Sequence, residues 1–171
     1  MKKYIKYSAV FLALGVIGGV FYREFSKAYG VVNTYTPLGL VHPHFLVLGV
    51  AFMLIIGLVT EKLNKTDSKL LTAAVRVYSA GVLGTGIMLF ARGISDVLQK
   101  SAKLDFEISK GANGAMSGIA GMCHIVLGVG LVMIFVGWLL NKKPATVKEN
   151  AAKHGEVEAS VAVTDGGEEE K

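Results

Sequence analysis

The chain has 171 residues, enough for one domain, and 52% of them are hydrophobic. A soluble domain of this size would expose too much apolar surface with that composition, so an ordinary soluble protein is excluded. The formal net charge is +5, but the basic residues flank apolar runs instead of forming a patch, which argues against a nucleic-acid partner and for the lipid bilayer.

The first apolar stretch runs from about Tyr4 to Tyr22, after Lys2 and Lys3. A cleaved signal peptide is the alternative. However, the apolar run is long for a signal core, and charged residues lie just before the small residues that could mimic a cleavage site. We therefore predict a retained membrane helix.

Three further stretches reach the length of about 20 mostly apolar residues that a spanning helix needs. They run from Leu38 or Pro43 to Thr60, from Leu70 to about Phe90, and from Ala115 to Leu140. A short polar loop, Glu61 to Lys69, joins the second and third stretches, so these helices should be antiparallel neighbours. Residues 1–141 are thus predicted to form an all-α, four-helix transmembrane bundle.

The orientation follows from the basic residues. If the N-terminus is in the cytoplasm, twelve Lys and Arg residues lie inside and six outside, which predicts that both ends are cytoplasmic. Residues 142–171 are rich in Ala, Glu, Lys and Gly and cannot bury enough apolar area to fold alone. We predict that they form a disordered cytoplasmic tail.

Ionisable groups inside a membrane are costly and are therefore candidates for function. The candidates here are Arg23, Glu24, His42, His44, Arg92 and His124. His44, His124 and Arg23 each lie 17 residues from a polar residue at the predicted inner boundary, about 25 Å in a straight helix. Arg92 lies slightly further out, so four helices place polar groups at a similar outer level.

Direction separates the two neighbouring histidines. Residues two apart cannot share a helix face. Because proline suits the first turn of a helix, Pro43 predicts that His44 lies inside the helix and His42 just before it. In the last helix, one stripe combines His124 with small residues, namely Ser117, Gly121 and Gly128. This stripe could accept another helix or a planar ligand.

Four segments together resemble a bacterial family of four-helix membrane proteins catalogued as a domain of unknown function. They are GVFYREFSK (19–27), VHPHFLVLG (41–49), ARGISDVL (91–98) and SGIAGMCH (117–124). The resemblance covers residues 4–140. It implies a multi-pass protein of the bacterial plasma membrane and brings no established activity. The H-x-H pair also resembles histidine motifs of haem-binding membrane proteins such as the haem–copper oxidase large subunit.

Three functions remain open. In the first, His44 and His124 are axial ligands of a b-type haem, with Arg23 and Arg92 pairing the propionates, in a carrier of electrons or a sensor. In the second, His42, His44 and His124 bind zinc or copper, with Glu24 as a fourth ligand.

In the third, no cofactor is bound, and the polar residues form a hydrogen-bonded cap in a scaffold, a partner subunit or a homo-oligomer. The sequence has no nucleophile–base pair, phosphate-binding loop or paired carboxylates. Hydrolase and kinase chemistry are therefore disfavoured, and a redox role is the enzymatic alternative that remains.

Overall fold

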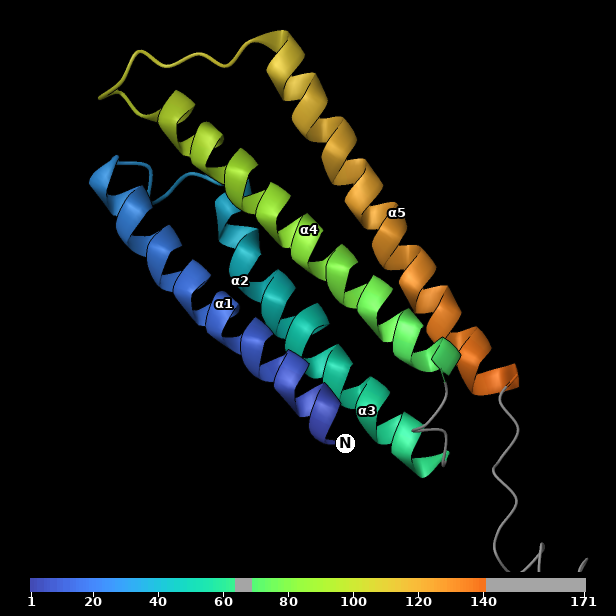
Figure 1. The fold of residues 1–171 in the computed structure, drawn as a ribbon. Helices are drawn as coiled ribbons and strands as arrows, with labels where there is room; N and C mark the ends of the chain where they lie inside the picture. The colour runs from blue at the N-terminus through green and yellow to red at the C-terminus, as the bar shows by residue number, and fades with distance from the viewer. Residues whose placement is uncertain (64–68, 141–171) are drawn as a thin grey trace, which may run out of the picture. The chain divides into compact units, whose positions relative to one another are not determined.

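The computed structural model describes residues 1–63 and 69–140. These residues form helices and no strand (Figure 1). The elements are α1 (Lys2–Ala28), η1 (Pro37–Leu40), α2 (Val41–His44), η2 (Phe45–Ala51), α3 (Phe52–Lys62), α4 (Lys69–Lys100) and α5 (Lys110–Leu140). The predicted all-α fold is confirmed, whereas the predicted tail, 142–171, lies outside the described residues.

The elements η1, α2, η2 and α3 follow one another without a break, so that Pro37–Lys62 forms one rod, here called the second span. This rod and the helices α1, α4 and α5 are each long and apolar enough to cross a membrane. The protein is therefore a multi-pass membrane protein. Four spans return the chain to the side on which it began, and the cytoplasmic identity of that side stays a prediction from the charge bias.

Two helices continue well beyond their predicted ends. The helix α1 ends at Ala28 instead of Tyr22, and α4 ends at Lys100 instead of Phe90. The reason is that hydropathy marks the part of a helix in lipid, whereas backbone hydrogen bonding continues into water. The last turn of α4 is further stabilised by an i,i+4 ion pair of 2.8 Å between Asp96 and Lys100.

The outer loops are fastened by hydrogen bonds between α1 and the segment that follows α4. Ser101 Oγ donates to the Tyr29 carbonyl over 2.9 Å, and Lys103 Nζ donates to the Ala28 carbonyl over 2.6 Å. Lys100 Nζ also donates to the Tyr35 carbonyl over 2.8 Å. These bonds hold the outer ends of α1 and α4 together.

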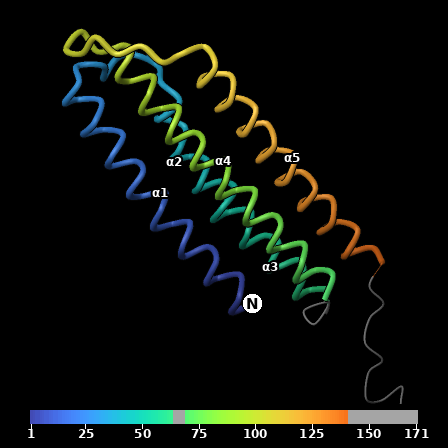
Figure 2. Tube along the Cα trace, turned by 45° about the horizontal axis from the view of Figure 1, so that its top comes forward, coloured from blue at the N-terminus to red at the C-terminus, as the bar shows by residue number. Residues whose placement is uncertain are grey.

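The helices pack in series. The helix α1 packs against the second span, the second span packs against α4, and α4 packs against α5 (Figures 1 and 2). Glycines permit the closest approaches: a side chain on Gly81 would collide with the backbone of Leu127, and one on Gly130 with the backbone of Tyr78. Small residues at such crossings let membrane helices pack by van der Waals contact.

The two halves of α5 have different surroundings. Its inner half crosses α4, and its inner end is tied to α3, since Trp138 Nε1 donates to Thr60 Oγ1 over 3.0 Å. In its outer half, a methyl group built on Gly114, Gly118 or Gly121 would meet nothing within 4 Å. Open space therefore lies beside the outer half of α5.

Candidate functional site

His44 is the last residue of α2 and faces α4. Its Nε2 lies 2.6 Å from Thr85 Oγ1. The single proton of the Thr85 hydroxyl is donated back along α4, to the carbonyl of Gly81 at 2.8 Å or of Val82 at 3.0 Å. With that proton assigned to α4, His44 Nε2 is assigned as the donor to Thr85, and Nδ1 of the neutral ring keeps its lone pair. The Val82 backbone is a further hydrogen-bond partner of the ring.

His124 lies in the outer half of α5, and its side chain is exposed. Its Nδ1 donates to the Ala120 carbonyl one turn earlier, over 2.8 Å. In the neutral ring this bond leaves Nε2 as the nitrogen with a free lone pair. An exposed imidazole within a membrane span is costly, so a group that covers this ring would stabilise the protein.

The packing of α4 against α5 sets the two histidines at one level. Gly84 lies beside Cys123, and Gly81 lies beside Leu127, so Thr85 is level with the turn that carries His124. His44 contacts Thr85, and His124 directly follows Cys123, whose side chain lies beside Gly84, the residue before Thr85. The structure therefore brings His44 and His124 to the same height beside α4.

His42 points elsewhere. Its Nδ1 donates to the Gly15 carbonyl of α1 over 3.1 Å, and its ring lies over Gly19. The two histidines of the H-x-H pair thus contact different helices. Among the residues that the structure describes, no three His, Cys, Asp or Glu side chains lie close enough to hold a metal ion.

The prediction that His42 precedes the helix is wrong. Pro37 begins the second span with the 3-10 turn η1, and α2 follows directly at Val41, so both histidines are helical. Pro43 is tolerated because it lies within the first turns, where few backbone N–H groups have a helical partner. The earlier start adds nearly two turns at the outer end of the span.

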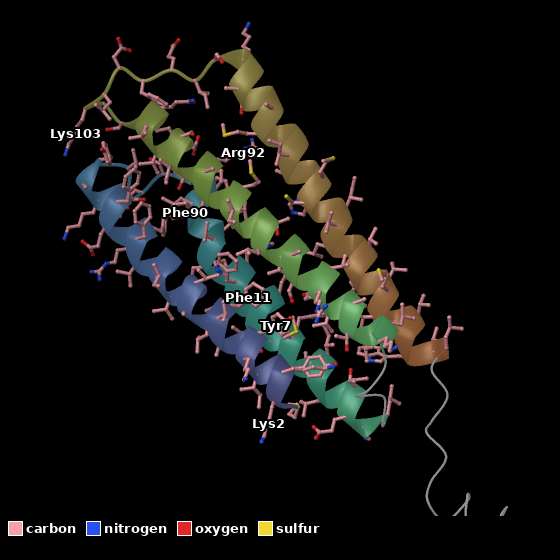
Figure 3. The ribbon with its side chains drawn as sticks, in the orientation of Figure 1. Lys2, Tyr7, Phe11, Phe90, Arg92 and Lys103 are labelled. Atoms are coloured by element: carbon pink, nitrogen blue, oxygen red, sulfur yellow. The ribbon has the colours of Figure 1, made fainter. Side chains whose placement is uncertain are left out.

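The two arginines differ in position. Arg92 is half-buried on α4 and lines a pocket of about 140 Å³ with Asp96, Asn113 and Met116, between the outer ends of α4 and α5. It follows Thr85 by seven residues, so it lies on the same helix face about 10 Å further out. Figure 3 shows Arg92 on the α5 side of α4.

Arg23 belongs to the outer surface of α1. Its side chain is 79% exposed and lies 3.9 Å from Glu24, which is also exposed. Because α4 separates α1 from α5 in both views, Arg23 is not brought to His124 (Figures 1 and 2). Of the two arginines that the sequence offers as propionate partners, Arg92 lies on the face of α4 that carries Thr85, and Arg23 lies on α1.

Thr85 is the contact residue that the sequence does not reveal. A threonine is uncharged and tolerated in membrane helices, so it gives no signal comparable to that of an intramembrane histidine. Thr85 lies on the same face of α4 as Gly81 (i−4) and Arg92 (i+7). This position indicates a contact residue only once His44 is known to lie opposite. The hydroxyl fixes the His44 ring.

Comparison with curated proteins and with solved structures gave no match. A match with a known family covers all of the described residues. It extends over residues 1–142, and the family is described as "Protein of unknown function (DUF2871)". As the resemblance predicted, the chain belongs to this family of unknown function.

Proposed function

We propose that this membrane protein binds one b-type haem between His44 and His124, as an electron carrier or as a sensor of a gas or of redox state. The observation that carries the proposal is the common height of these two imidazoles beside α4. Histidine is a usual axial ligand of haem iron, and two different helices here each offer one.

The donor atoms fit this cofactor. His124 has Nδ1 bound to the Ala120 carbonyl, the kind of bond that orients a ligating histidine and fixes its tautomer. His44 is oriented by Thr85 through Nε2. It would therefore coordinate through Nδ1, or release Thr85 to coordinate through Nε2.

The space and the charge also fit. A methyl group built on Gly121 or Gly128, which flank His124 by three and four residues, would meet nothing within 4 Å. A flat macrocycle needs such an open face. Arg92 lies two turns beyond Thr85 and offers a guanidinium to a propionate. When bound by both histidines, the haem iron would supply one-electron redox chemistry, and a gas would have to replace one of the two histidines.

The zinc or copper alternative has less support. It needs His42 together with His44 and His124, but His42 is bonded to α1 while His44 is bonded to α4. The scaffold alternative needs no cofactor. The absorption spectrum described next distinguishes it from the haem proposal.

The test is the absorption spectrum of the purified full chain, produced with an ample haem supply and measured oxidised and reduced. We expect a Soret band and sharp bands on reduction. His44→Ala and His124→Ala should each abolish or shift these bands, whereas the matched control His42→Ala should retain them. A protein without a Soret band, or one whose spectrum survives both His44→Ala and His124→Ala, would contradict the proposal.

A further inference from the structure

A groove runs between α1 and α4, on the side of α4 away from α5. Its inner part has a volume of about 520 Å³ and is lined by Lys3, Lys6, Tyr7, Val10 and Phe11 of α1 and by Ser79, Ala80 and Leu83 of α4. A second pocket of about 250 Å³ shares Leu83 and continues it to Phe90. We call the two together the α1–α4 groove.

The groove has a closed outer end and an apolar interior. The ring centroids of Phe21 and Phe90 are 4.9 Å apart, and this contact joins α1 to α4 at the outer end of the outer pocket, which Phe90 lines. Figure 3 labels Tyr7, Phe11 and Phe90 along this path. Ile17, near the outer end, lies 14 residues beyond Lys3, a rise of about 21 Å, which exceeds half of the roughly 30 Å hydrocarbon core. An acyl chain of one leaflet therefore fits its length.

The mouth of the groove is positively charged. Lys3 and Lys6 line the inner pocket, and Lys3 Nζ donates to Thr72 Oγ1 of α4 over 3.2 Å. Arg76 lies on the same stripe of α4 as Thr72 and Ser79, and its side chain is exposed. No Asp or Glu lines either pocket. A positive mouth above an apolar interior suits an amphipathic anion.

Ser79 adds an independent observation. The residue is only 8% exposed, and its Oγ has no hydrogen-bond partner among the described residues, although it lines the groove. A buried hydroxyl without a partner is unfavourable, so a polar atom of a ligand is expected there.

The depth of Ser79 indicates which polar atom this is. Because α1 and α4 begin at the same end and Lys3 contacts Thr72, the same offset places Val10 level with Ser79. Val10 follows Lys6 by four residues, a rise of about 6 Å. In a glycerophospholipid, the ester carbonyl lies below the phosphate at a separation of this order.

We propose that the α1–α4 groove binds one anionic glycerophospholipid. Lys6 and Arg76, with Lys3, hold the phosphate, Ser79 donates to an ester carbonyl, and one acyl chain lies along the groove toward Phe90. Basic pockets between membrane helices at the cytoplasmic side bind anionic headgroups in this way. The site is separate from the proposed haem site, because α4 lies between them.

Native mass spectrometry of the purified full chain tests the charge. The protein is incubated with equal amounts of phosphatidylglycerol and phosphatidylcholine that carry the same acyl chains. We expect the wild type to retain phosphatidylglycerol preferentially, and Lys6→Gln and Arg76→Gln each to lower this preference about fivefold. Lys62→Gln, which removes an equal charge at the exposed end of α3, is the matched control and should leave it unchanged.

Two more variants test the groove itself. Ala80→Phe fills the inner pocket and should abolish retention of both lipids, whereas Ala115→Phe, at an exposed position of α5 on the other side of α4, should not. Phosphatidylglycerol with ether-linked chains lacks the ester carbonyl. It should be retained less than the ester lipid by the wild type and equally by Ser79→Ala.

Three outcomes would overturn the proposal. The wild type could retain both headgroups equally. Lys62→Gln could lower the preference as much as Lys6→Gln does, which would indicate bulk charge. Finally, Ala80→Phe could change the oligomeric mass of the protein without changing lipid retention, which would make the groove a contact between protein chains.

Discussion

Thr85 links two helices through one hydroxyl, accepting from His44 and donating within α4. Thr85→Val keeps the shape of the side chain but leaves the His44 N–H without its acceptor. We expect a loss of about 0.6 kcal/mol in stability, the average for interhelical hydrogen bonds in membranes, and at most about 1.7 kcal/mol. Thermal unfolding in detergent measures it. Thr85→Ser restores the hydroxyl and should recover most of the loss; an equal loss in both variants would show that packing alone matters.

The sequence could predict part of the candidate site at this scale. Counting residues from the inner charges placed His44 and His124 at a common depth, because rise per residue is the same in every helix. It could not predict which of His42 and His44 would face α4. Which histidine faces α4 depends on where the second span begins and on whether its turns are α-helical or π-helical. An apolar run predicts neither property.

The π-helix η2 is the element that is hardest to predict from the sequence. Its seven residues, Phe45–Ala51, read as ordinary apolar span, yet they wind more widely than an α-helix. The wide turns let Phe45 lie against Gly86 of α4 and Gly49 against Phe11 of α1. They also set the rotation of α2, which carries the two histidines, about the helix axis relative to α3.

Deleting Val47 should convert η2 toward an α-helix. Val47 is 57% exposed, so the deletion removes little buried surface. It should rotate α2 by about 100° relative to α3, since each residue advances an α-helix by that angle. We expect the His44–Thr85 bond to break and the unfolding temperature to fall much further than in Val47→Ala. Equal unfolding temperatures for the two variants would show that η2 does not set this angle.

Over the whole molecule, the number of spans was predictable and their packing order was not. The length of each apolar run predicts one span. Because all four runs are similarly apolar, their composition does not predict that α5 packs against α4 while α1 packs against the second span. The glycines that decide this order, such as Gly81 and Gly130, are indistinguishable in the sequence from glycines that contact nothing.

The orientation is tested by cysteine labelling in a Cys123→Ser background. Single cysteines at Lys27 and Lys103 should react with an impermeant reagent from outside intact cells, whereas those at Lys65 and Lys143 should react only after the cells are opened. The reason is the twelve-to-six bias of basic residues. Reaction of position 65 from outside would invert the topology. Lys103 contacts the Ala28 carbonyl, so positions 27 and 103 should behave alike.

The serial packing has a consequence for biogenesis. A ribosome delivers the chain from its N-terminus, so α1, the second span and α4 can associate, with His44 already bonded to Thr85, before α5 is made. His124 arrives last, on a helix that leans mainly on α4. Under the proposed function, maturation would be a late event, in which an apoprotein already inserted in the bilayer takes up its cofactor laterally past the open outer half of α5.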